Sequence, residues 1–298
     1  MNPEVVENKL ESLETDLLLE AVYRHYGYDF RNYEPSAVRR RIRETMLATR
    51  VATISRFQEK LLHEPVFMSR FLRAFSSTGL TLFSDPNFFT AFRSNVIPTL
   101  RTYAFIRVWH AGCSTGEDVY SMAILLKEEG LYARSRIYAT DLSDISLKQA
   151  RVGSYPRSAI EQCARDYRDA GGAGSLSDYF YKRGNRLVID RLLKKNIVFS
   201  EHNLATDGSL NEFQVIVCRN MLGMFNHTLR ERVGSLINES LSRFGILALG
   251  GGESFDWMPF GFRYELINEE GGLYQKLGST GIATPGWRES KDRQRVER

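Results

Sequence analysis

Two short polar turns hold the side chains that are best suited to chemistry. The stretch HAGCSTGED, residues 110–118, follows an apolar run and carries two glycines, a threonine and two acids. About one helix and one strand later, the stretch ATD brings Asp141 into a corresponding position. A glycine-bearing turn lets a ligand approach the backbone, and an acid after the next strand accepts hydrogen bonds from a ribose. The two turns therefore predict a site for a ligand that contains a ribose.

The acids of the first turn indicate the charge of that ligand. The turn is neither GxGxxG nor a P-loop, because no Gly-Lys-Ser/Thr follows it, and this disfavours a phosphate. Glu117 and Asp118 disfavour an anion as well, although the start of a helix would attract one. A cationic ligand with a ribose points to S-adenosylmethionine. The alternative is that Thr115, Glu117 and Asp141 only cap helices.

Alternating strands and helices must position these turns. Apolar residues recur at helical spacing over 10–26, 36–47 and 54–62, which predicts that the first hundred residues are helical. Further along, apolar runs that read as strands alternate with helical patterns, including a helix over 228–245. These runs are 105–113, 137–139, 195–204, 213–226, 246–255, 262–267 and 272–277. The alternation favours a mainly parallel sheet covered on both faces.

A less regular stretch interrupts the alternation between residues 155 and 193. Its glycines and serines indicate a flexible loop, and YFYKRGNRLVI predicts a hairpin that turns at Gly184 and Asn185. We therefore expect a small β subdomain inserted in the α/β part of the chain.

The composition excludes several classes of protein. With 298 residues, 43% of them hydrophobic, the chain is long enough for one large domain or two modest ones. A net charge of +4 gives no general case for nucleic acid. The three cysteines lack zinc-ligand spacing, so no metal is expected. No signal-peptide pattern and no run of about 18 uncharged apolar residues occurs, so we expect a cytoplasmic protein without membrane insertion.

Five sequence blocks occur in an order and spacing that point to one family. They are AGCSTGEDVYSMAILL, IYATDLSDISLKQARVGSYP, FSEHNL, VIVCRNMLGMFN and GGGESF. From about Tyr26 to Leu277 the chain resembles the CheR family of S-adenosylmethionine-dependent methyltransferases, which esterify glutamates on bacterial chemoreceptors. The resemblance implies S-adenosylmethionine as cofactor, with S-adenosylhomocysteine as product.

The resemblance also implies an α/β fold with a Rossmann-like class I methyltransferase sheet. An all-helical N-terminal domain is expected over residues 1–100, and an S-adenosylmethionine-binding methyltransferase domain over 101–280. The inserted β subdomain would occupy 155–193, and a flexible charged tail would follow over 281–298.

Ten positions are implied to contact the cofactor. They are Thr78, Leu80, Ser84, Gly112, Asp118, Asp141, Asn203, Leu204, Asn220 and Met221. Asp118 is a shorter acid than the family's usual glutamate. Cys113 and Cys218 lie in the same motifs and are expected to be small buried residues, because free cysteine is commonly buried. His110 and His202 are expected to have packing or surface roles.

Two positions depart from the family's pattern at the implied catalytic centre. Aligned without gaps on FSDP, Ser84 stands where relatives have an active-site arginine, and Leu80 stands where they have a threonine. A one-residue gap would bring Thr81 to the threonine position instead. In CRNMLGMFN, Met224 replaces a tyrosine that lies beside the transferring methyl. Losing an arginine clamp on a carboxylate costs on the order of 100-fold through misplacement.

The arginines of the second expected helix are the remaining catalytic candidates. Arg40 or Arg41 matches the start of the family's substrate-facing basic helix, and the spacing of Arg39 and Arg43 places them on one face. The alternative is a solvated helix surface. The resemblance implies an acidic protein substrate, which would be a chemoreceptor or signalling protein.

Three functions stay open at this point. The first is a protein-glutamate O-methyltransferase. The second is a catalytically impaired regulator that binds S-adenosylmethionine or S-adenosylhomocysteine. The third is an RNA or small-molecule methyltransferase, which the near-neutral charge and the helical N-terminal part disfavour.

Overall fold

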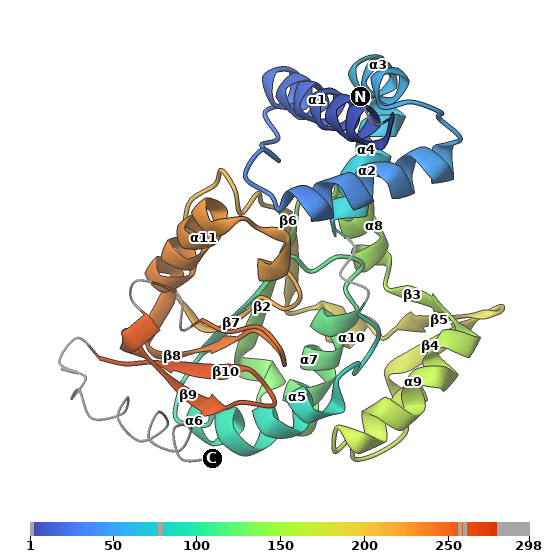
Figure 1. Cartoon of the computed structure of the whole chain (residues 1–298). Coiled ribbons are helices and arrows are strands. Elements are labelled where there is room, and N and C mark those ends of the chain that lie inside the picture. The colour runs from blue at the N-terminus through green and yellow to red at the C-terminus, as the bar shows by residue number, and fades with distance from the viewer. Residues whose placement is uncertain (1–2, 77–79, 256–257, 259–260, 279–298) are drawn as a thin grey trace, which may run out of the picture.

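The computed structural model describes residues 3–76, 80–255, 258 and 261–278 (Figure 1). The chain forms a helical N-terminal domain, a seven-stranded sheet with helices against it, and a small three-stranded sheet. Thr78 and the tail expected over 281–298 lie outside the described residues.

Four helices build the N-terminal domain. They are α1 (Pro3–Tyr26), α2 (Pro35–Thr49), α3 (Ile54–His63) and α4 (Pro65–Ser76), so the three helices predicted from apolar spacing are confirmed. Local signals set their ends: Pro35 occupies the first turn of α2, and the Thr53 side chain accepts a hydrogen bond from the Arg56 N–H at the start of α3. Aromatic side chains, among them Phe30 and Phe71, fill the space between the helices.

The large sheet has the strand order β6-β2-β1-β7-β8-β10-β9. Its strands are β1 (Ile106–Ala111), β2 (Ser135–Asp141), β6 (Ile197–Glu201), β7 (Phe213–Val217), β8 (Leu241–Ala248), β9 (Tyr264–Asn268) and β10 (Leu273–Lys276). The first five in this order run parallel, and β10 pairs antiparallel with both β8 and β9. The expected mainly parallel sheet is confirmed. Since the chain moves outward through β2 and β6 and then returns to β7, the order reverses between β1 and β7.

Successive side chains of the central strands enter two different hydrophobic clusters, as the alternation of a strand requires. Trp109 and Ile216 pack with the N-terminal helices and α11 (His227–Ser240). Val108 and Val215 pack with α7 (Glu117–Glu128) and with residues 82–100. Those last residues include α5 (Pro86–Ala91), the π-helical turn η1 (Phe92–Val96) and α6 (Ile97–Leu100). The division of the chain at residue 100 stays a prediction.

One helix is shorter than its sequence pattern indicated. The expected helix over 228–245 ends at Ser240, and β8 begins at Leu241, which pairs with Phe213 of β7. The Lys276 Nζ donates to the carbonyl oxygens of Asn238 and Leu241, at 2.6 and 2.8 Å. These contacts satisfy carbonyls that a longer helix would have paired, and so the chain can leave the helix early.

The inserted region contains more regular structure than a hairpin. The hairpin at Gly184 and Asn185 is confirmed by β4 (Phe180–Arg183) and β5 (Arg186–Ile189), and β3 (Ser154–Pro156) adds a third antiparallel strand. The expectation of an irregular stretch before it was wrong, because α9 (Arg157–Asp169) occupies residues that had been assigned to no element. Its buried positions, Ile160, Cys163 and Tyr167, follow helical spacing inside an otherwise polar segment.

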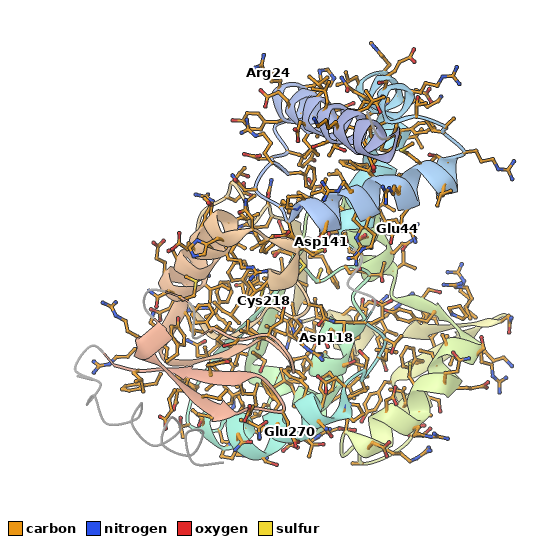
Figure 2. The ribbon with its side chains drawn as sticks, viewed as in Figure 1. Arg24, Glu44, Asp118, Asp141, Cys218 and Glu270 are labelled. Atoms are coloured by element: carbon orange, nitrogen blue, oxygen red, sulfur yellow. The ribbon has the colours of Figure 1, made fainter. Side chains whose placement is uncertain are left out.

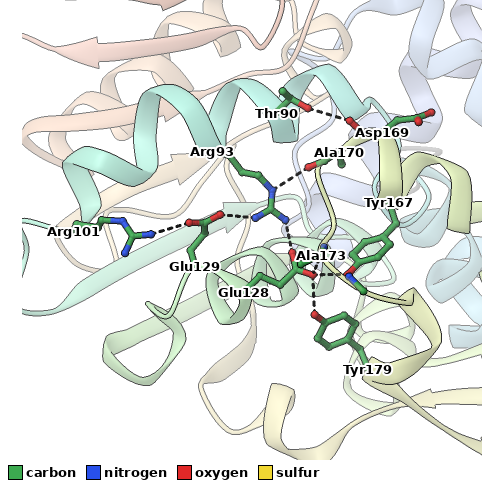
Figure 3. Close-up of polar contacts among 11 residues, drawn as sticks. Thr90, Arg93, Arg101, Glu128, Glu129, Tyr167, Asp169, Ala170, Ala173 and Tyr179 are labelled. Carbon is green, nitrogen blue, oxygen red and sulfur yellow. Dashed lines mark hydrogen bonds and ion pairs between the residues drawn. The ribbon is translucent and has the colours of Figure 1, made fainter.

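A polar cluster fixes this inserted region to the C-terminal end of α7 (Figure 3). The Glu128 carboxylate accepts hydrogen bonds from the hydroxyls of Tyr167 and Tyr179 and pairs with Arg93. Arg93 also donates to the Ala170 carbonyl, at 3.0 Å. Burial raises the pKa of Glu128, but the hydrogen bonds from the tyrosines and Arg93 outweigh it, and the pKa lies below its ordinary value. The carboxylate is therefore a charged anchor for the subdomain.

The helical domain contacts the sheet domain beside α8 (Asp144–Val152) and α11 (Figure 1). The Glu34 N–H donates to the Met224 carbonyl at 2.8 Å, and the Asn226 N–H donates to the Asn32 carbonyl at 3.0 Å. The rings of Tyr33 and Phe225 meet edge to face at 5.1 Å. These contacts bring the N-terminal domain against the loop that follows β7.

Candidate cofactor-binding site

The predicted site residues gather where the strand order reverses. The loop after β1 bonds directly to the end of β2, because the N–H groups of Gly112 and Cys113 both donate to the Thr140 carbonyl, at 2.9 and 2.8 Å. Figure 2 shows Asp118 and Asp141 in the interior of the molecule, whereas Glu44 lies on the helical domain. The crevice beside this reversal is where open α/β sheets bind ligands.

Gly112 could not be replaced by another residue without rearrangement. Its φ of +75° lies in the left-handed region, and a Cβ atom there would lie 2.7 Å from the Sδ of Met221. The loop after β1 and the loop after β7 thus approach one another through a glycine and a methionine side chain. Gly112 lines two small hollows, and Met221 lines one of them.

The first hollow is polar. Of the residues implied to contact the cofactor, Leu80, Gly112 and Asp118 line it, and His110 and Arg219 line it with them. Asp141 is the one acid among the residues that line the second hollow. The implied contacts that line it are Gly112, Asp141, Asn203, Leu204 and Met221. Seven of the ten implied positions therefore border one of two adjoining hollows.

Arg219 is central to the charge of the first hollow. Its Nη1 donates to Asp118 Oδ1 and its Nη2 to Asp85 Oδ2, both at 2.8 Å. The guanidinium also lies 4.1 Å from the centre of the Phe88 ring. His110 is buried and neutral, because burial lowers its pKa to about 4. The carboxylates of Glu117 and Asp118 line the hollow with this one guanidinium, and the net negative charge suits a cationic group.

Asp141 ties the two turns together. Its Oδ2 accepts from the Ser114 N–H at 2.8 Å and its Oδ1 from the Ser143 N–H at 2.9 Å. Burial raises the pKa of the carboxyl group, and hydrogen bonds from Ser76 and from these backbone groups oppose that rise.

The alternative that Thr115 and Asp141 only cap helices was wrong. Ser143 caps α8, its hydroxyl accepting from the Ser146 N–H, and α7 begins at Gly116 without a side-chain cap. The Thr115 hydroxyl instead donates to the Glu117 carboxylate at 2.7 Å.

Two implied cofactor positions lie beside the hollows without lining them. The hydroxyl of Ser84 accepts from the Thr81 N–H at 3.2 Å and so stabilises its own turn. Asn220 is exposed, and its N–H donates to Glu253 Oε2 at 3.0 Å.

The implied catalytic positions do not meet in one cavity. Arg40 is exposed, and Arg41 pairs with Glu44 at 3.0 Å and lines a separate surface hollow between α2 and α4. Met224 is buried in the hydrophobic cluster that joins the helical domain to the sheet. Serine and methionine carry no charge, so neither Ser84 nor Met224 adds a charged group to the site. The catalytic roles of Arg40, Arg41, Ser84 and Met224 stay predictions.

Backbone strain is concentrated in the motif loops. Among the described residues, six that are not glycine have a positive φ, and four of these are Phe83, Asp85, Ser114 and Asn220. Such conformations cost roughly 1–3 kcal/mol each and persist where the surrounding contacts determine them. The contacts of the motif loops therefore hold these residues in one arrangement.

Three buried nitrogen-bearing side chains of the site were not identified as site residues from the sequence. They are His110, His202 and Arg219, and each borders one of the two hollows. The histidines had been assigned to packing or the surface, and His202 does contact Trp109, with 5.4 Å between the ring centres. All three lie in or next to the family motifs, and this closeness in sequence could have indicated that they belong to the site.

The cysteines show no sign of chemistry. Cys113 and Cys218 are buried, as expected, and burial raises the pKa of both thiols. Within the described ranges, no three His, Cys, Asp or Glu side chains are grouped so that they could hold a metal ion. No helix in that part of the chain is both long and apolar enough to cross a bilayer.

Comparison with known proteins identifies both parts of the chain. Residues 80–265 match the model described as the CheR methyltransferase SAM-binding domain. Residues 13–76 match the model described as the CheR methyltransferase all-alpha domain.

Individual relatives extend over most of the chain. The Cher3 protein of Pseudomonas putida is 40% identical over 264 residues, which cover 89% of this chain and 97% of that protein. A chemotaxis protein methyltransferase of Listeria monocytogenes is 29% identical over 248 residues, 82% of this chain and 92% of that protein. An uncharacterized 104.1 kDa protein of Rhodobacter capsulatus is 28% identical over 234 residues, 76% of this chain but only 24% of that protein.

The two domain matches occur in the order in which the helical domain and the sheet follow one another along the chain. The chain therefore belongs to the CheR methyltransferase family, and its sheet domain is the S-adenosylmethionine-binding domain of that family.

Proposed function

We propose that this protein transfers a methyl group from S-adenosylmethionine to carboxylate side chains of a chemoreceptor or a related acidic signalling protein. One observation carries the proposal. Tyr33, Phe75 and Ser76 of the helical domain line the same hollow as Asp141 and Asn203 of the sheet domain. A protein segment held by the helical domain would thus arrive at the cofactor. The cytoplasmic location expected from the sequence belongs to this proposal.

The site residues fit a cofactor with a positive charge. Glu117 and Asp118, which line the first hollow, outnumber Arg219, and His110 is neutral, so this hollow favours a cation. The buried apolar side chains of Leu204 and Met221 are suited to exclude water. When bound, S-adenosylmethionine supplies a methyl group on a positively charged sulfur.

The chain itself needs to supply no base. A glutamate carboxylate is ionised near neutral pH, so one of its oxygens already carries the electron pair that forms the new bond to carbon. The electron pair of the breaking bond stays on sulfur, and the products are a methyl ester and S-adenosylhomocysteine. Catalysis then rests on positioning the two reactants in line and on the field of the fixed charges.

The arginines of α2 support docking of an acidic segment. Arg40 and Arg43 are exposed, with side-chain accessibilities of 62% and 63%. Acids partly offset this charge, because Arg43 pairs with Glu11 at 2.7 Å and Glu44 lies 4.0 Å from Arg40. We therefore assign the helix to weak electrostatic guidance of the partner.

A second candidate function is a regulator that binds the cofactor without using it. The surroundings of Ser84 and Met224, the two residues that differ from the family's pattern, favour this candidate. The Ser84 hydroxyl is engaged in its own turn, and the Met224 side chain is packed among apolar groups. Neither provides the polar contact that the family resemblance implies at its position.

Methyl transfer from labelled S-adenosylmethionine to the cytoplasmic part of a chemoreceptor from the same operon separates the candidates. Label released by mild base, as a methyl ester is, supports the first candidate. The second predicts that the parent binds the cofactor by calorimetry without transferring label, and that Ser84→Arg with Met224→Tyr produces transfer. Failure of the parent to bind the cofactor would contradict both, and base-stable label in RNA or a small molecule would point elsewhere.

A further inference from the structure

A cleft with a basic lining lies where the helical domain, the sheet domain and the inserted subdomain meet. This basic cleft is lined by Arg73 of α4, Lys148 of α8 and Arg186 of β5, together with Thr115, Glu117 and Tyr155. Its volume of about 550 Å³ is within the range of about 300–1,000 Å³ that is usual for ligand sites. Figure 1 shows α8 between the end of α4 and strand β3, so the cleft exists only when the three parts of the chain are packed together.

The three basic side chains of the cleft are available to an anion. All three belong to exposed residues, and neither Arg73 nor Arg186 forms an ion pair with a residue that the structure describes. Lys148 pairs with Asp144 at 2.7 Å, but its side chain is 71% exposed, and an exposed pair of this kind is weak. Glu117 is the one acid among the described residues that line the cleft, so positive charge is in excess there.

Hydrogen bonds fix the wall of the cleft that the inserted subdomain provides. Arg186 Nε donates to the Ser154 hydroxyl at 2.8 Å, and its Nη2 donates to the Ser154 carbonyl, so the guanidinium is held against β3. The hydroxyl of the buried Tyr155 donates to the Thr115 carbonyl at 3.3 Å and ties β3 to the turn after β1. A side chain that is already oriented loses less conformational freedom on binding, so Arg186 is preorganised to contact an anion.

The basic cleft adjoins the space for the cofactor. Glu117 lines both the cleft and the first hollow, and the end of α4 lines the second hollow through Phe75 and Ser76. The two neighbouring spaces differ in charge, because the first hollow is net negative and the cleft is net positive. A cation and an anion that react with one another would therefore each find a complementary surface side by side.

Arg73 extends the basic cleft towards the surface of the helical domain. It also lines the hollow between α2 and α4, which has a volume of about 410 Å³, and Arg70 lines that hollow with it. The two spaces meet at one arginine side chain, so a chain segment could extend from one into the other. Such an elongated basic path suits an acidic polypeptide better than a small anion, which a single hollow would hold.

We propose that the basic cleft binds the acidic segment of the partner protein that carries the glutamate to be methylated, and that Arg73, Lys148 and Arg186 determine the preference for such a segment. The inference rests on the proposed function and extends it, because it assigns specificity to a surface shared by three parts of the chain. Acidic side chains beside the target glutamate would accept charge-assisted hydrogen bonds from the three basic groups. The target carboxylate would lie at the inner end of the cleft, where Glu117 borders the first hollow.

Charge reversal at Arg73 tests the assignment. In calorimetry with S-adenosylhomocysteine present, Arg73→Glu should bind the cytoplasmic part of a chemoreceptor from the same operon about tenfold more weakly than the parent. In the methyl transfer assay KM for that fragment should rise by a similar factor while kcat stays unchanged. The affinity for S-adenosylhomocysteine should stay within about twofold, because Arg73 lines neither of the two hollows beside Gly112.

Two further variants separate a local charge from other effects. Arg56→Glu is the matched control, because it makes the same change of charge at an exposed arginine of α3 outside the cleft, and it should leave receptor binding within about twofold. Arg73→Lys keeps the charge and should retain the affinity for the receptor fragment to within about threefold. Arg186→Gln should weaken binding about three- to tenfold, and its effect should add to that of Arg73→Gln.

Unchanged receptor binding in Arg73→Glu would overturn the inference, and equal weakening by Arg56→Glu would do so by indicating attraction to the overall charge. Binding of inorganic phosphate that the receptor fragment does not displace would assign the cleft to a small anion instead. If Arg73→Glu methylates the fragment with the KM of the parent, the cleft is refuted and the proposed function stands. If the parent binds the fragment through Arg73 but transfers no methyl group, the proposed function is refuted and the cleft stands. A parent that neither binds nor methylates the fragment would overturn both.

Discussion

Arg219 and Asp118 form a buried ion pair, with 2.8 Å between Nη1 and Oδ1, that joins the loop after β7 to the start of α7. Their side chains are only 3% and 8% exposed. A further 2.8 Å contact from Arg219 Nη2 to Asp85 adds the segment before α5. One guanidinium thus holds three segments that are distant in sequence and sets the charge at the site.

Asp118→Asn should weaken S-adenosylmethionine more than S-adenosylhomocysteine. The substitution removes one negative charge, and only the first ligand carries a positive sulfur, so we expect the ratio of the two affinities to change by about tenfold. Calorimetry with both ligands measures the ratio. Asp144→Asn, which removes an exposed pair with Lys148, is the control and should leave the ratio unchanged. An unchanged ratio in Asp118→Asn would show that the charge of the Asp118 carboxylate does not stabilise the positive sulfur.

Gly112→Ala should impair cofactor binding through a steric clash. The new Cβ would lie 2.7 Å from Met221 Sδ, and the displaced methionine would narrow both hollows. We expect a loss of affinity for S-adenosylhomocysteine of about tenfold or more. Gly27→Ala is the matched control, because Gly27 has a φ of +80° and open space around it. Both variants pay about 1–2 kcal/mol of backbone strain, so equal effects on binding would rule out the clash.

Glu128→Gln should loosen the inserted subdomain. It removes the charged acceptor of Tyr167, Tyr179 and Arg93, and we expect about 1–3 kcal/mol less free energy of unfolding near pH 7. Since the pKa of Glu128 is lowered in the folded chain, its stabilisation is present above the ordinary value of 4.5 and is lost as the pH falls below it. Denaturant unfolding should show a smaller difference in the free energy of unfolding between variant and parent at pH 4 than at pH 7. Glu161→Gln, on an exposed pair with Arg157, serves as the control and should cost less than about 1 kcal/mol.

His110 should make the protein less stable in mild acid. The pKa of the buried imidazole is lowered to about 4, whereas the unfolded chain takes up a proton near 6.5. Between these values the unfolded state binds more protons, so the free energy of unfolding falls as the pH is lowered from 6.5 towards 4. In His110→Gln this part of the slope should disappear. His227→Gln, at a histidine that is 78% exposed, should retain it; a parent-like slope in His110→Gln would contradict the prediction.

Short-range signals in the sequence determined the sheet and the position of the site. Strands were recognisable because β-branched and aromatic runs, such as 105–113 and the start of 213–226, are followed by turns and helical spacing. The carboxyl ends of parallel strands lie at one edge of a sheet, so the loops that carry Gly112 and Asp141 had to be neighbours. This is why the kind of ligand could be predicted from two turns.

Other features depended on contacts that the sequence pattern does not contain. The early end of α11 depends on pairing of Leu241 with β7 and on Lys276 from the far end of the domain. Helix α9 was missed because only three buried positions mark it in a polar segment. Such decisions follow from tertiary contacts that override local preference.

The sequence by itself determined the family resemblance, the sheet and the loops that form the site. Only the tertiary structure decided which side chains meet there. Arg219 and Asp118 lie 101 positions apart, and nothing local to either residue predicts their pairing. The same holds for His110 and His202, because only the folded chain brings their unpartnered nitrogens to the hollows. Burial and hydrogen-bond partners are properties of the folded chain, and they show that two histidines expected to have packing or surface roles border the hollows.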